Sequence, residues 1–253
     1  AWGYNFDWQA KAFYVPVGTP NVVSSVYIGN GLLDFSEVGR EESTRRLAQG
    51  VKDFILSEMI LREDGQHLVF AYIPNEKAEV HNASLLAAAF LSRFVQDDPS
   101  LATRIHKAVR FSIGDIQTNG YWPYGTMPHH RWMDNFHTAF NLEALLTIRK
   151  NLTTTEYDEV IRRVFGFYIE NFFLEDGTPK YYLKNIYPID VHTIAESIVF
   201  LSKVSENAQG FFAEKERGQA EDVLGRVVEY AFRNFWDKRG YFYFQKERYW
   251  FNK

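Results

Sequence analysis

Acidic and histidine side chains occur together in two similar segments of the sequence. Asp134 and His137 belong to the segment WMDNFHTAF, and Asp190 and His192 belong to the segment IDVHTIAES. An imidazole accepts and donates protons near neutral pH, and a carboxylate close by can act as an acid or a base. We predict that Asp134, His137, Asp190 and His192 perform acid/base chemistry. The competing interpretation is that each histidine only bonds a neighbouring backbone carbonyl.

The acidic residues also allow hydrolysis by a pair of carboxylates. Such a pair needs a separation of roughly 5 to 9.5 Å, with one group as acid and the other as base or nucleophile. Asp134 and Asp190 are the best candidates, although Asp190 is also expected to cap a helix. Glu143 and Glu196 are further candidates, because a carboxylate in a nearly apolar helix is costly unless it is paired. Glu196 could equally be a buried partner of an arginine.

These residues lie in a repeating pattern of helices. A turn signal followed by aromatic residues recurs at Gly65, Gly120, Gly177 and Gly240, at intervals of 55, 57 and 63 residues. Each repeat is long enough for two helices and a loop. In each repeat the first helix is predicted to start at Asn or Asp, which are favoured N-cap residues. The predicted starts are Asn21, Asn82, Asn135 and Asp190, with a fifth at Asn252.

The two helices of each repeat differ in composition. The second has apolar residues at spacings of three and four and a polar opposite face, over residues 42–60, 100–116, 155–173 and 213–235. This pattern predicts an outer helix that faces solvent. The first helix has small and apolar residues and few charges, which predicts an inner helix buried on nearly all sides.

Alternating inner and outer helices, with blocks such as VHNASLLAAAFL and WMDNFHTAFNLEALL, give the sequence its resemblance to a known superfamily. It resembles the six-hairpin (α/α) toroids, which include glycoside hydrolases, unsaturated glucuronyl hydrolases and sugar 2-epimerases. The same blocks look like uncharacterised toroids encoded among bacterial surface-polysaccharide genes. The resemblance implies an all-α toroid of helical hairpins with short β-hairpins in the loops. We expect one domain over residues 1–253, an open or incomplete ring and possible origin from a longer chain.

The resemblance also implies where a site would lie and what it would do. In such a toroid the inner helices run parallel, so their N-termini and the preceding loops form a cleft at one end. Helix N-termini favour anionic groups, so an anionic sugar is slightly preferred to a neutral one. In the related 2-epimerases two histidines across a sugar ring remove and return a proton, and His137 and His192 are expected at equal depth. The predicted function is a sugar epimerase, hydrolase or lyase.

Substrate contacts are predicted from aromatic and polar residues in the same loops. Aromatic rings at the mouth of a cleft stack on the apolar faces of sugar rings, and amides and hydroxyls bond sugar hydroxyls. The predicted substrate-binding residues are Trp122, Tyr124, Trp132, His81, Asn82, Asn135, Glu196 and Tyr72.

Composition excludes several other classes of protein. The chain has no cysteine, so disulfides and cysteine-ligated zinc are excluded. A net charge of −4 without a basic stripe disfavours nucleic acid. His129 and His130 are adjacent, and side chains adjacent in an extended loop point in opposite directions, so no metal site is predicted. No cofactor motif is present, and no apolar run is long enough to span a membrane.

Two other functions and the cellular location follow from the same features. A toroid that only binds or scaffolds glycans would use the same aromatic residues without catalysis. An isoprenoid-processing toroid would use them to stabilise cations, but no DDxxD or DxDD motif is present. The first residues lack the pattern of a signal peptide, so a cytoplasmic location is expected unless such a peptide has been removed. The oligomeric state is not predicted.

Overall fold

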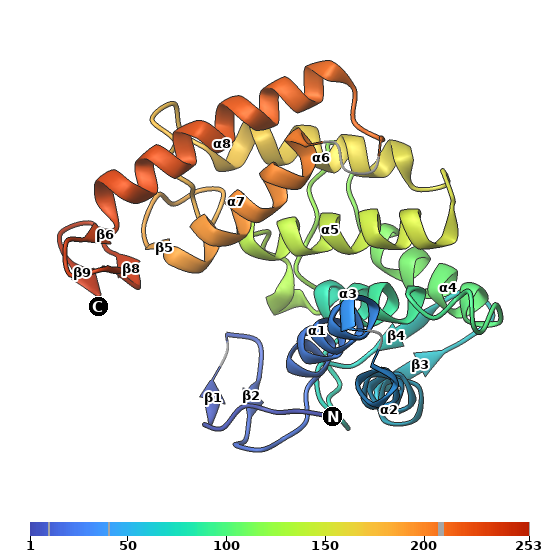
Figure 1. Ribbon diagram of the computed structural model, residues 1–253. Coiled ribbons are helices and arrows are strands. Elements are labelled where there is room, and N and C mark those ends of the chain that lie inside the picture. The colour runs from blue at the N-terminus through green and yellow to red at the C-terminus, as the bar shows by residue number, and fades with distance from the viewer. Residues whose placement is uncertain (10, 40, 207–209, 253) are drawn as a thin grey trace. The chain divides into compact units, whose positions relative to one another are not determined.

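The computed structural model describes residues 1–9, 11–39, 41–206 and 210–252, which form consecutive pairs of α-helices (Figure 1). The first members of the pairs are α1 (Val22–Gly39), α3 (His81–Ser92), α5 (Asn135–Leu152) and α7 (Val191–Ser205). The second members are α2 (Glu42–Glu58), α4 (Leu101–Ile113), α6 (Asp158–Phe172) and α8 (Glu214–Asn234). The predicted all-α fold of repeated helical hairpins is confirmed.

Short antiparallel strands occupy the connections, as predicted. The two-stranded pairs are β1 (Trp8–Gln9) with β2 (Tyr14–Val15), β3 (Ile60–Glu63) with β4 (Leu68–Phe70), and β6 (Trp236–Asp237) with β7 (Tyr241–Phe242). A three-stranded sheet contains β5 (Ile189–Asp190), β8 (Gln245–Lys246) and β9 (Phe251–Asn252). A 3-10 turn, η1, covers Pro128–His130.

The predicted helix start at Asn252 is wrong. Asn252 lies in β9 and pairs with Gln245 of β8. Its neighbour Phe251 packs edge-on against Phe235 and tilted against Tyr243, with ring centroids 5.8 and 4.7 Å apart. Aromatic residues suit a half-buried strand of this kind, so cross-strand packing overrides the capping preference of asparagine.

The described chain divides into two compact units. Unit 1 comprises Ala1–Ile116, Pro123–Arg131 and Thr147–Glu156. Unit 2 comprises Gln117–Trp122, Trp132–Leu146 and Tyr157–Lys253. Helices α1 to α4 belong to unit 1 and α6 to α8 to unit 2, while α5 begins in unit 2 and ends in unit 1. A single toroid domain over residues 1–253 stays a prediction.

Two inner helices begin at the predicted capping residue. Asn21 precedes α1, and its side-chain oxygen accepts the backbone N–H of Ser24 over 2.8 Å. Asp190 precedes α7, and its carboxylate accepts the backbone N–H of His192 over 2.8 Å. Each side chain satisfies an amide that has no partner within its helix, which fixes where the helix starts.

At the other two inner helices the predicted cap is wrong, by one residue at α5 and by two residues at α3. The carboxylate of Asp134 accepts the backbone N–H of His137, so Asp134 caps α5 and Asn135 is the first helical residue. Helix α3 begins at His81, with Val80 as its N-cap residue and no side-chain cap bond. Asn82 therefore lies inside the first turn. Where two capping residues are adjacent, the sequence alone does not say which of them caps.

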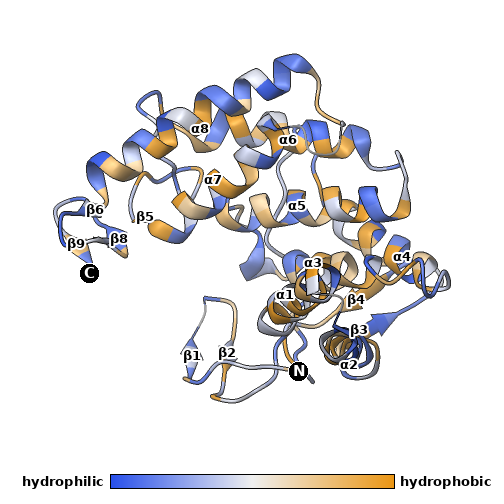
Figure 2. Ribbon diagram, in the orientation of Figure 1, coloured by the Kyte–Doolittle hydropathy of each residue, from blue (hydrophilic) through white to orange (hydrophobic). Residues whose placement is uncertain are grey.

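The predicted difference between inner and outer helices holds for part of the fold. Nearly every residue of α3 is buried. Helix α8 buries residues at spacings of three and four, and Figure 2 shows hydrophobic and hydrophilic residues alternating along it. Burial on nearly all sides is wrong for α1 and α7, because Tyr27 and Phe35 on α1 and His192 and Val199 on α7 are exposed. A helix that packs on only part of its surface leaves such a face uncovered.

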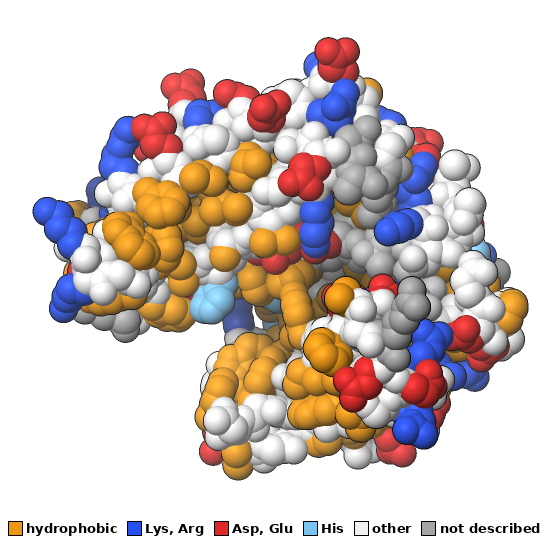
Figure 3. Space-filling model, in the orientation of Figure 1, with side chains coloured by type: hydrophobic (Ala, Val, Ile, Leu, Met, Phe, Trp, Pro, Cys, Tyr) orange, Lys and Arg blue, Asp and Glu red, His pale blue; other side chains and the backbone are white. Residues whose placement is uncertain are grey.

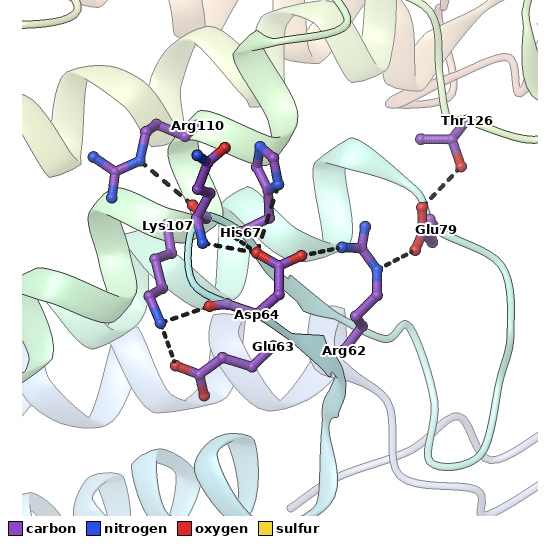
Figure 4. A network of polar contacts seen from close by, with 9 residues as sticks. Arg62, Glu63, Asp64, His67, Glu79, Lys107, Arg110 and Thr126 are labelled. Atoms are coloured by element: carbon purple, nitrogen blue, oxygen red, sulfur yellow. Dashed lines mark hydrogen bonds and ion pairs between the residues drawn. The ribbon is translucent and has the colours of Figure 1, made fainter.

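A polar network in unit 1 fixes the hairpin β3–β4 to the loop that leads into α3 (Figure 4). Arg62 bridges Asp64 at 2.9 Å and Glu79 at 3.1 Å, and Glu79 accepts the hydroxyl of Thr126 at 3.1 Å. Lys107 of α4 donates to Glu63 at 3.1 Å. Single exposed ion pairs contribute little, but a network that joins four segments restrains the loop before His81.

Candidate acid/base site in unit 2

The first candidate pair is built at the start of α5. Asp134 has a side chain that is 1% exposed, and its carboxylate lies 2.9 Å from Nδ1 of His137. The carboxylate also accepts the backbone N–H of His137 and the indole N–H of Trp132, at 2.8 and 3.0 Å. One carboxylate therefore caps the helix, orients the imidazole and holds the Trp132 ring.

The second pair repeats this geometry at the start of α7. Oδ1 of Asp190 lies 3.0 Å from Nδ1 of His192 and accepts its backbone N–H. The His192 side chain is 62% exposed, whereas that of His137 is 22% exposed. A carboxylate at Nδ1 favours the tautomer with the proton on Nδ1, which leaves the lone pair on Nε2. In that tautomer each imidazole is a base directed away from its aspartate.

The two histidines are not at equivalent helix positions, contrary to the prediction. Counted from the capping aspartate, His137 is the third residue and His192 the second. The residue of α5 that corresponds to His192 is Phe136. Its ring centroid lies 5.2 Å from that of His137 and 6.3 Å from that of His192. The prediction was offset because it took Asn135 instead of Asp134 as the cap.

Phe136 and Phe244 are site residues that sequence reasoning missed. Phe244 is exposed and packs edge-on against His192, with centroids 5.7 Å apart. Phe136 is half-buried and contacts both imidazoles. Phe136 lies between Asn135 and His137 in the sequence, so its proximity to the site could have been predicted. Phe244 lies far along the chain, and only the pairing of β5 with β8 brings it to His192.

Asn135 has a structural role beneath the first pair. Its side-chain oxygen accepts the hydroxyls of Tyr168 and Ser197, at 2.9 and 3.1 Å. These residues are buried and come from α5, α6 and α7. Burial raises the pKa of Tyr168, so this phenol stays neutral and donates a hydrogen bond. The network ties the starts of α5 and α7 together and explains why Asn135 faces the interior.

Within the described part of the chain no arginine is paired with Glu196, and the carboxylate of Glu143 acts on it electrostatically. Lys203 donates to Oε2 of Glu143 over 2.6 Å. Glu196 is 8% exposed, and its Oε1 has no hydrogen-bond partner among the described residues. Burial, followed by the charge of Glu143, raises the pKa of Glu196 to about 8, while Lys203 acts in the opposite direction.

The remaining predicted aromatic contacts are mostly buried. Trp122 of unit 2 is 2% exposed, and Tyr124 of unit 1 is also buried, so neither ring presents a face to solvent. The backbone N–H of Trp122 donates a hydrogen bond to the sulfur of Met133. Trp132 is half-buried and fixed by Asp134. The side chains of Trp122 and Tyr124 are buried, and a role of Trp122, Tyr124 and Trp132 in sugar binding stays a prediction.

The predicted residues of unit 1 form a separate set. His81 is fully buried, and its Nε2 lies 2.9 Å from the carboxylate of Asp115, which Arg131 also contacts at 2.5 Å. Burial raises the pKa of Asp115, but the bonds from His81 and Arg131 outweigh it and the net shift is downward. Asn82 is buried, and its side-chain oxygen has no hydrogen-bond partner in the part of the chain that the structure describes.

Tyr72 is the last of the predicted substrate-binding residues in unit 1. It is buried among the rings of Trp8 and Phe13, and its hydroxyl lies 2.8 Å from that of Tyr4. Burial raises the pKa of Tyr72, so its phenol remains neutral. These contacts give Tyr72 a packing role, while a role in substrate binding stays a prediction.

No group of three or more acidic or histidine side chains suited to a metal ion occurs among the described residues. His129 and His130 do not point apart as predicted, because η1 brings their rings to 4.2 Å. His130 is fully buried, and burial, followed by the charge of His129, lowers its pKa. No described helix is long and apolar enough to cross a membrane.

A cavity of about 370 Å³ lies elsewhere in unit 2. The loop before α7, the end of α8 and β8 form its walls. Its polar residues include Asp176, Tyr230, Arg233 and Lys246. Ile189, which precedes Asp190 in β5, also lines it, so the cavity adjoins the strand that carries the aspartate of the second pair.

Comparisons with known proteins relate this architecture to solved structures. No protein-family model matches the sequence, and neither does any curated protein. A cellobiose 2-epimerase from Bacillus thermoamylovorans B4167 superposes with a TM-score of 0.70 at 13% identity, over 90% of this chain and 64% of that one. A sugar epimerase from a ruminal bacterium gives 0.77 at 9% identity, over 99% of this chain and 69% of that one.

A third similar structure has a different activity. The unsaturated glucuronyl hydrolase of Bacillus sp. GL1 gives a TM-score of 0.67 at 14% identity, over 86% of this chain and 63% of that one. This chain thus spans less than two thirds of the length of the glucuronyl hydrolase and of the cellobiose 2-epimerase. At these identities the similarity establishes the fold. The chain has an (α/α) toroid fold.

Proposed function

We propose that this chain carries the acid/base machinery of a carbohydrate-active enzyme, with His137 and His192 as the proton-transferring groups. The observation that supports the proposal most directly is the pair of aspartate–histidine contacts, at 2.9 and 3.0 Å. A buried carboxylate that holds Nδ1 of an imidazole fixes its tautomer and stabilises the imidazolium that forms. The toroid fold, shared with structures named as sugar epimerases and a glucuronyl hydrolase, supplies the substrate class.

The geometry favours proton transfer at carbon over hydrolysis by two carboxylates. Asp134 already accepts three hydrogen bonds, and Asp190 accepts the backbone N–H of His192 and lies against its ring. A carboxylate committed in this way is a poor nucleophile. An imidazole with its lone pair on Nε2 can instead take a proton from a carbon beside a carbonyl, as in an open-chain sugar. Epimerisation returns the proton to the opposite face, and a lyase expels a leaving group.

The structure weakens one reason for expecting an anionic substrate. The starts of α5 and α7 were expected to attract an anion, but Asp134 and Asp190 already place carboxylates there. Another negative group at either helix start would be repelled. We therefore propose a sugar in which the reacting group is a neutral carbonyl, and we retain uronic acids among the compounds to be tested.

Hydrogen exchange at carbon tests this proposal. The protein is incubated in D₂O with cellobiose, mannose, N-acetylated hexosamines and uronic acids, and proton NMR follows loss of the signal at the carbon next to the anomeric centre. Exchange that disappears in His137→Asn and His192→Asn supports proton abstraction by these residues. Bond cleavage without exchange would indicate hydrolysis. Binding of a sugar without exchange or cleavage would point to a glycan-binding module and contradict the proposal.

A further inference from the structure

The cavity of about 370 Å³ in unit 2 contains neither of the two aspartate–histidine pairs. Its walls come from the segment 174–189 that precedes α7, from the last turns of α8 and from Lys246 of β8. All of these segments belong to unit 2. Ligand-binding cavities usually measure about 300 to 1,000 Å³, so a cavity near the lower end of this range suits a small molecule.

The pairing of β5 with β8 separates the cavity from the second aspartate–histidine pair. Ile189 pairs with Lys246, and both residues line the cavity. Residues directly opposite each other on two strands have their side chains on the same face, and the next residue of each strand points to the other face. Asp190 therefore points away from the cavity, toward the backbone N–H of His192 that it accepts. The cavity is a site distinct from the candidate acid/base site.

Lys246 brings a positive charge to the cavity. Its Nζ lies 6.0 Å from the ring centroid of Tyr230 and 5.4 Å from that of Phe251. It forms no ion pair with an acidic side chain in the part of the chain that the structure describes. Aromatic faces hold an ammonium group by electrostatic attraction, and its three N–H donors can still reach the oxygens of a ligand.

Asp176 brings a negative charge to the same cavity. Its carboxylate accepts the backbone N–H of Thr178 over 2.9 Å. Burial raises the pKa of Asp176, but the hydrogen bonds from Thr178 outweigh it and the net shift is downward, so the group is ionised at neutral pH. A carboxylate has about four acceptor positions, so Asp176 can also accept hydrogen bonds from the hydroxyls of a ligand.

The charges around the cavity balance one another. Arg233 donates to Glu229, and both side chains are exposed, so this pair adds no net charge. Asp176 and Lys246 also have opposite signs. An anion near Lys246 would be repelled by Asp176, and a cation near Asp176 would be repelled by Lys246. A neutral ligand whose hydroxyls both donate and accept hydrogen bonds fits this arrangement better than an ion of either sign.

Tyrosine rings and neutral hydroxyls complete the lining. Tyr230 is buried, and burial raises its pKa to about 12, so its phenol is neutral. Thr178 and Tyr187 also line the cavity. Tyrosine rings suit the apolar face of a sugar ring, and the hydroxyls of tyrosine and threonine bond sugar hydroxyls. A sugar presents both kinds of surface, whereas a lipid chain has no hydroxyls for the charged groups.

We propose that this cavity is a second saccharide-binding site, which takes one or two residues of a neutral sugar and performs no catalysis. Asp176 and Lys246 bond the hydroxyls of the sugar, and Tyr187 packs against its ring. The proposal does not rest on the proposed function, because a sugar in the cavity lies on the face of β5 opposite to Asp190.

Methyl NMR of the isoleucine side chains locates binding in the full chain. Ile186 and Ile189 line the cavity, whereas Ile55 is buried in unit 1 and is the internal reference. Glucose, galactose, mannose and cellobiose are added in turn, and at least one is expected to shift the Ile186 and Ile189 signals saturably without moving that of Ile55. Inorganic phosphate and tetramethylammonium are the charged probes. A saturable shift with a charged probe and none with a sugar would overturn the proposal, as would no shift with any compound.

Substitution of the two charged residues tests how the sugar is held. Lys246→Gln and Asp176→Asn should each raise the dissociation constant at least about tenfold, because each weakens a hydrogen bond with a charged partner. Lys238→Gln is the matched control and should bind like the wild type, because Lys238 is exposed and does not line the cavity. Wild-type affinity in both Lys246→Gln and Asp176→Asn would contradict the proposal.

The double variant His137→Asn/His192→Asn separates this proposal from the proposed function. The sugar-dependent shift of Ile186 is expected to persist in it, since neither histidine lines the cavity. Absence of exchange at carbon in the wild type would then contradict only the proposed function. Loss of the Ile186 shift in the double variant would mean that the sugar binds at the histidines, which would overturn the second site. Circular dichroism verifies that each variant is folded.

Discussion

The substitution Glu196→Gln is expected to stabilise the protein, and increasingly so as the pH rises. Glutamine is nearly isosteric with the protonated acid but cannot ionise. In the wild type the pKa of Glu196 rises from 4.5 to about 8 on folding, chiefly because of burial. Between these two values the folded state binds a proton that the unfolded state has released, so wild-type stability falls with increasing pH. The glutamine variant does not undergo this loss.

The size of the effect follows from the pKa difference. About 3.5 pH units at 1.36 kcal/mol per unit set an upper limit of about 5 kcal/mol above pH 8. The charges of Glu143 and Lys203 act on Glu196 in opposite directions and make its titration depend on theirs. We therefore expect a smaller gain, of about 2–3 kcal/mol at pH 8.5 and less than about 1 kcal/mol at pH 5.

Urea unfolding monitored by tryptophan fluorescence at pH 5 and pH 8.5 measures this difference. The control variant is Glu206→Gln, because Glu206 is an exposed residue at the end of the same helix. It should change the free energy of unfolding by less than about 0.5 kcal/mol at either pH. A gain for Glu196→Gln that is the same at both pH values would refute the reasoning, because it would show that Glu196 has the same protonation in the folded and unfolded states. A loss at both would indicate an ionised, paired carboxylate.

Three further substitutions test other parts of the structure. Asp134→Asn should reduce exchange at carbon on the order of 100-fold in NMR assays, because the amide no longer stabilises the imidazolium of His137; unchanged exchange would remove Asp134 from the mechanism. Gly177→Ala should lower the free energy of unfolding in urea by at least about 1 kcal/mol more than Gly240→Ala does. Both glycines have positive φ, but only at Gly177 would the added Cβ meet a backbone carbonyl, that of Arg226 at 2.3 Å; equal losses would show that the contact relaxes. Tyr168→Phe should cost about 1–2 kcal/mol in thermal unfolding, because a buried hydrogen bond is lost; no change would mean that water replaces the hydroxyl.

Much of the helical framework could be predicted from local pattern. The outer helices follow apolar spacings of three and four, which depend only on nearby residues, and α2, α4, α6 and α8 lie within the predicted ranges. The inner helices begin within one residue of the predicted starts. The errors at Asn135 and Asn82 come from competing local signals, since an aspartate precedes one and the buried His81 precedes the other.

The candidate site was predictable only as far as its residues lie near one another in sequence. Asp134 with His137, and Asp190 with His192, are three and two residues apart, and both pairs meet in the structure. Phe244 reaches His192 through strand pairing, so no local pattern could place it.

Aromatic content misled the prediction for a similar reason. Trp122 and Tyr124 were assigned to a cleft mouth because aromatic residues in a loop are unusual, but the side chains of these two residues are buried. Figure 3 shows hydrophobic side chains gathered over the region of α7 and the C-terminal strands, and the exposed residues there include Val199 and Phe244. Which aromatic rings reach the surface depends on long-range packing.

The strand β5 has a consequence for the order in which the site forms during synthesis. Ile189 and Asp190 pair with Lys246 and Gln245, and the backbone N–H of Val191 donates to the carbonyl of Phe244. The start of α7 is thus held by residues that leave the ribosome more than fifty positions later. Contacts of such sequence separation close late. The start of α5 is held in a similar way but by an earlier segment, because the backbone N–H of Asn135 donates to the carbonyl of Tyr181. A nascent chain that ends before Phe244 would have one ordered aspartate–histidine pair and one frayed pair, so activity should depend on the arrival of β8.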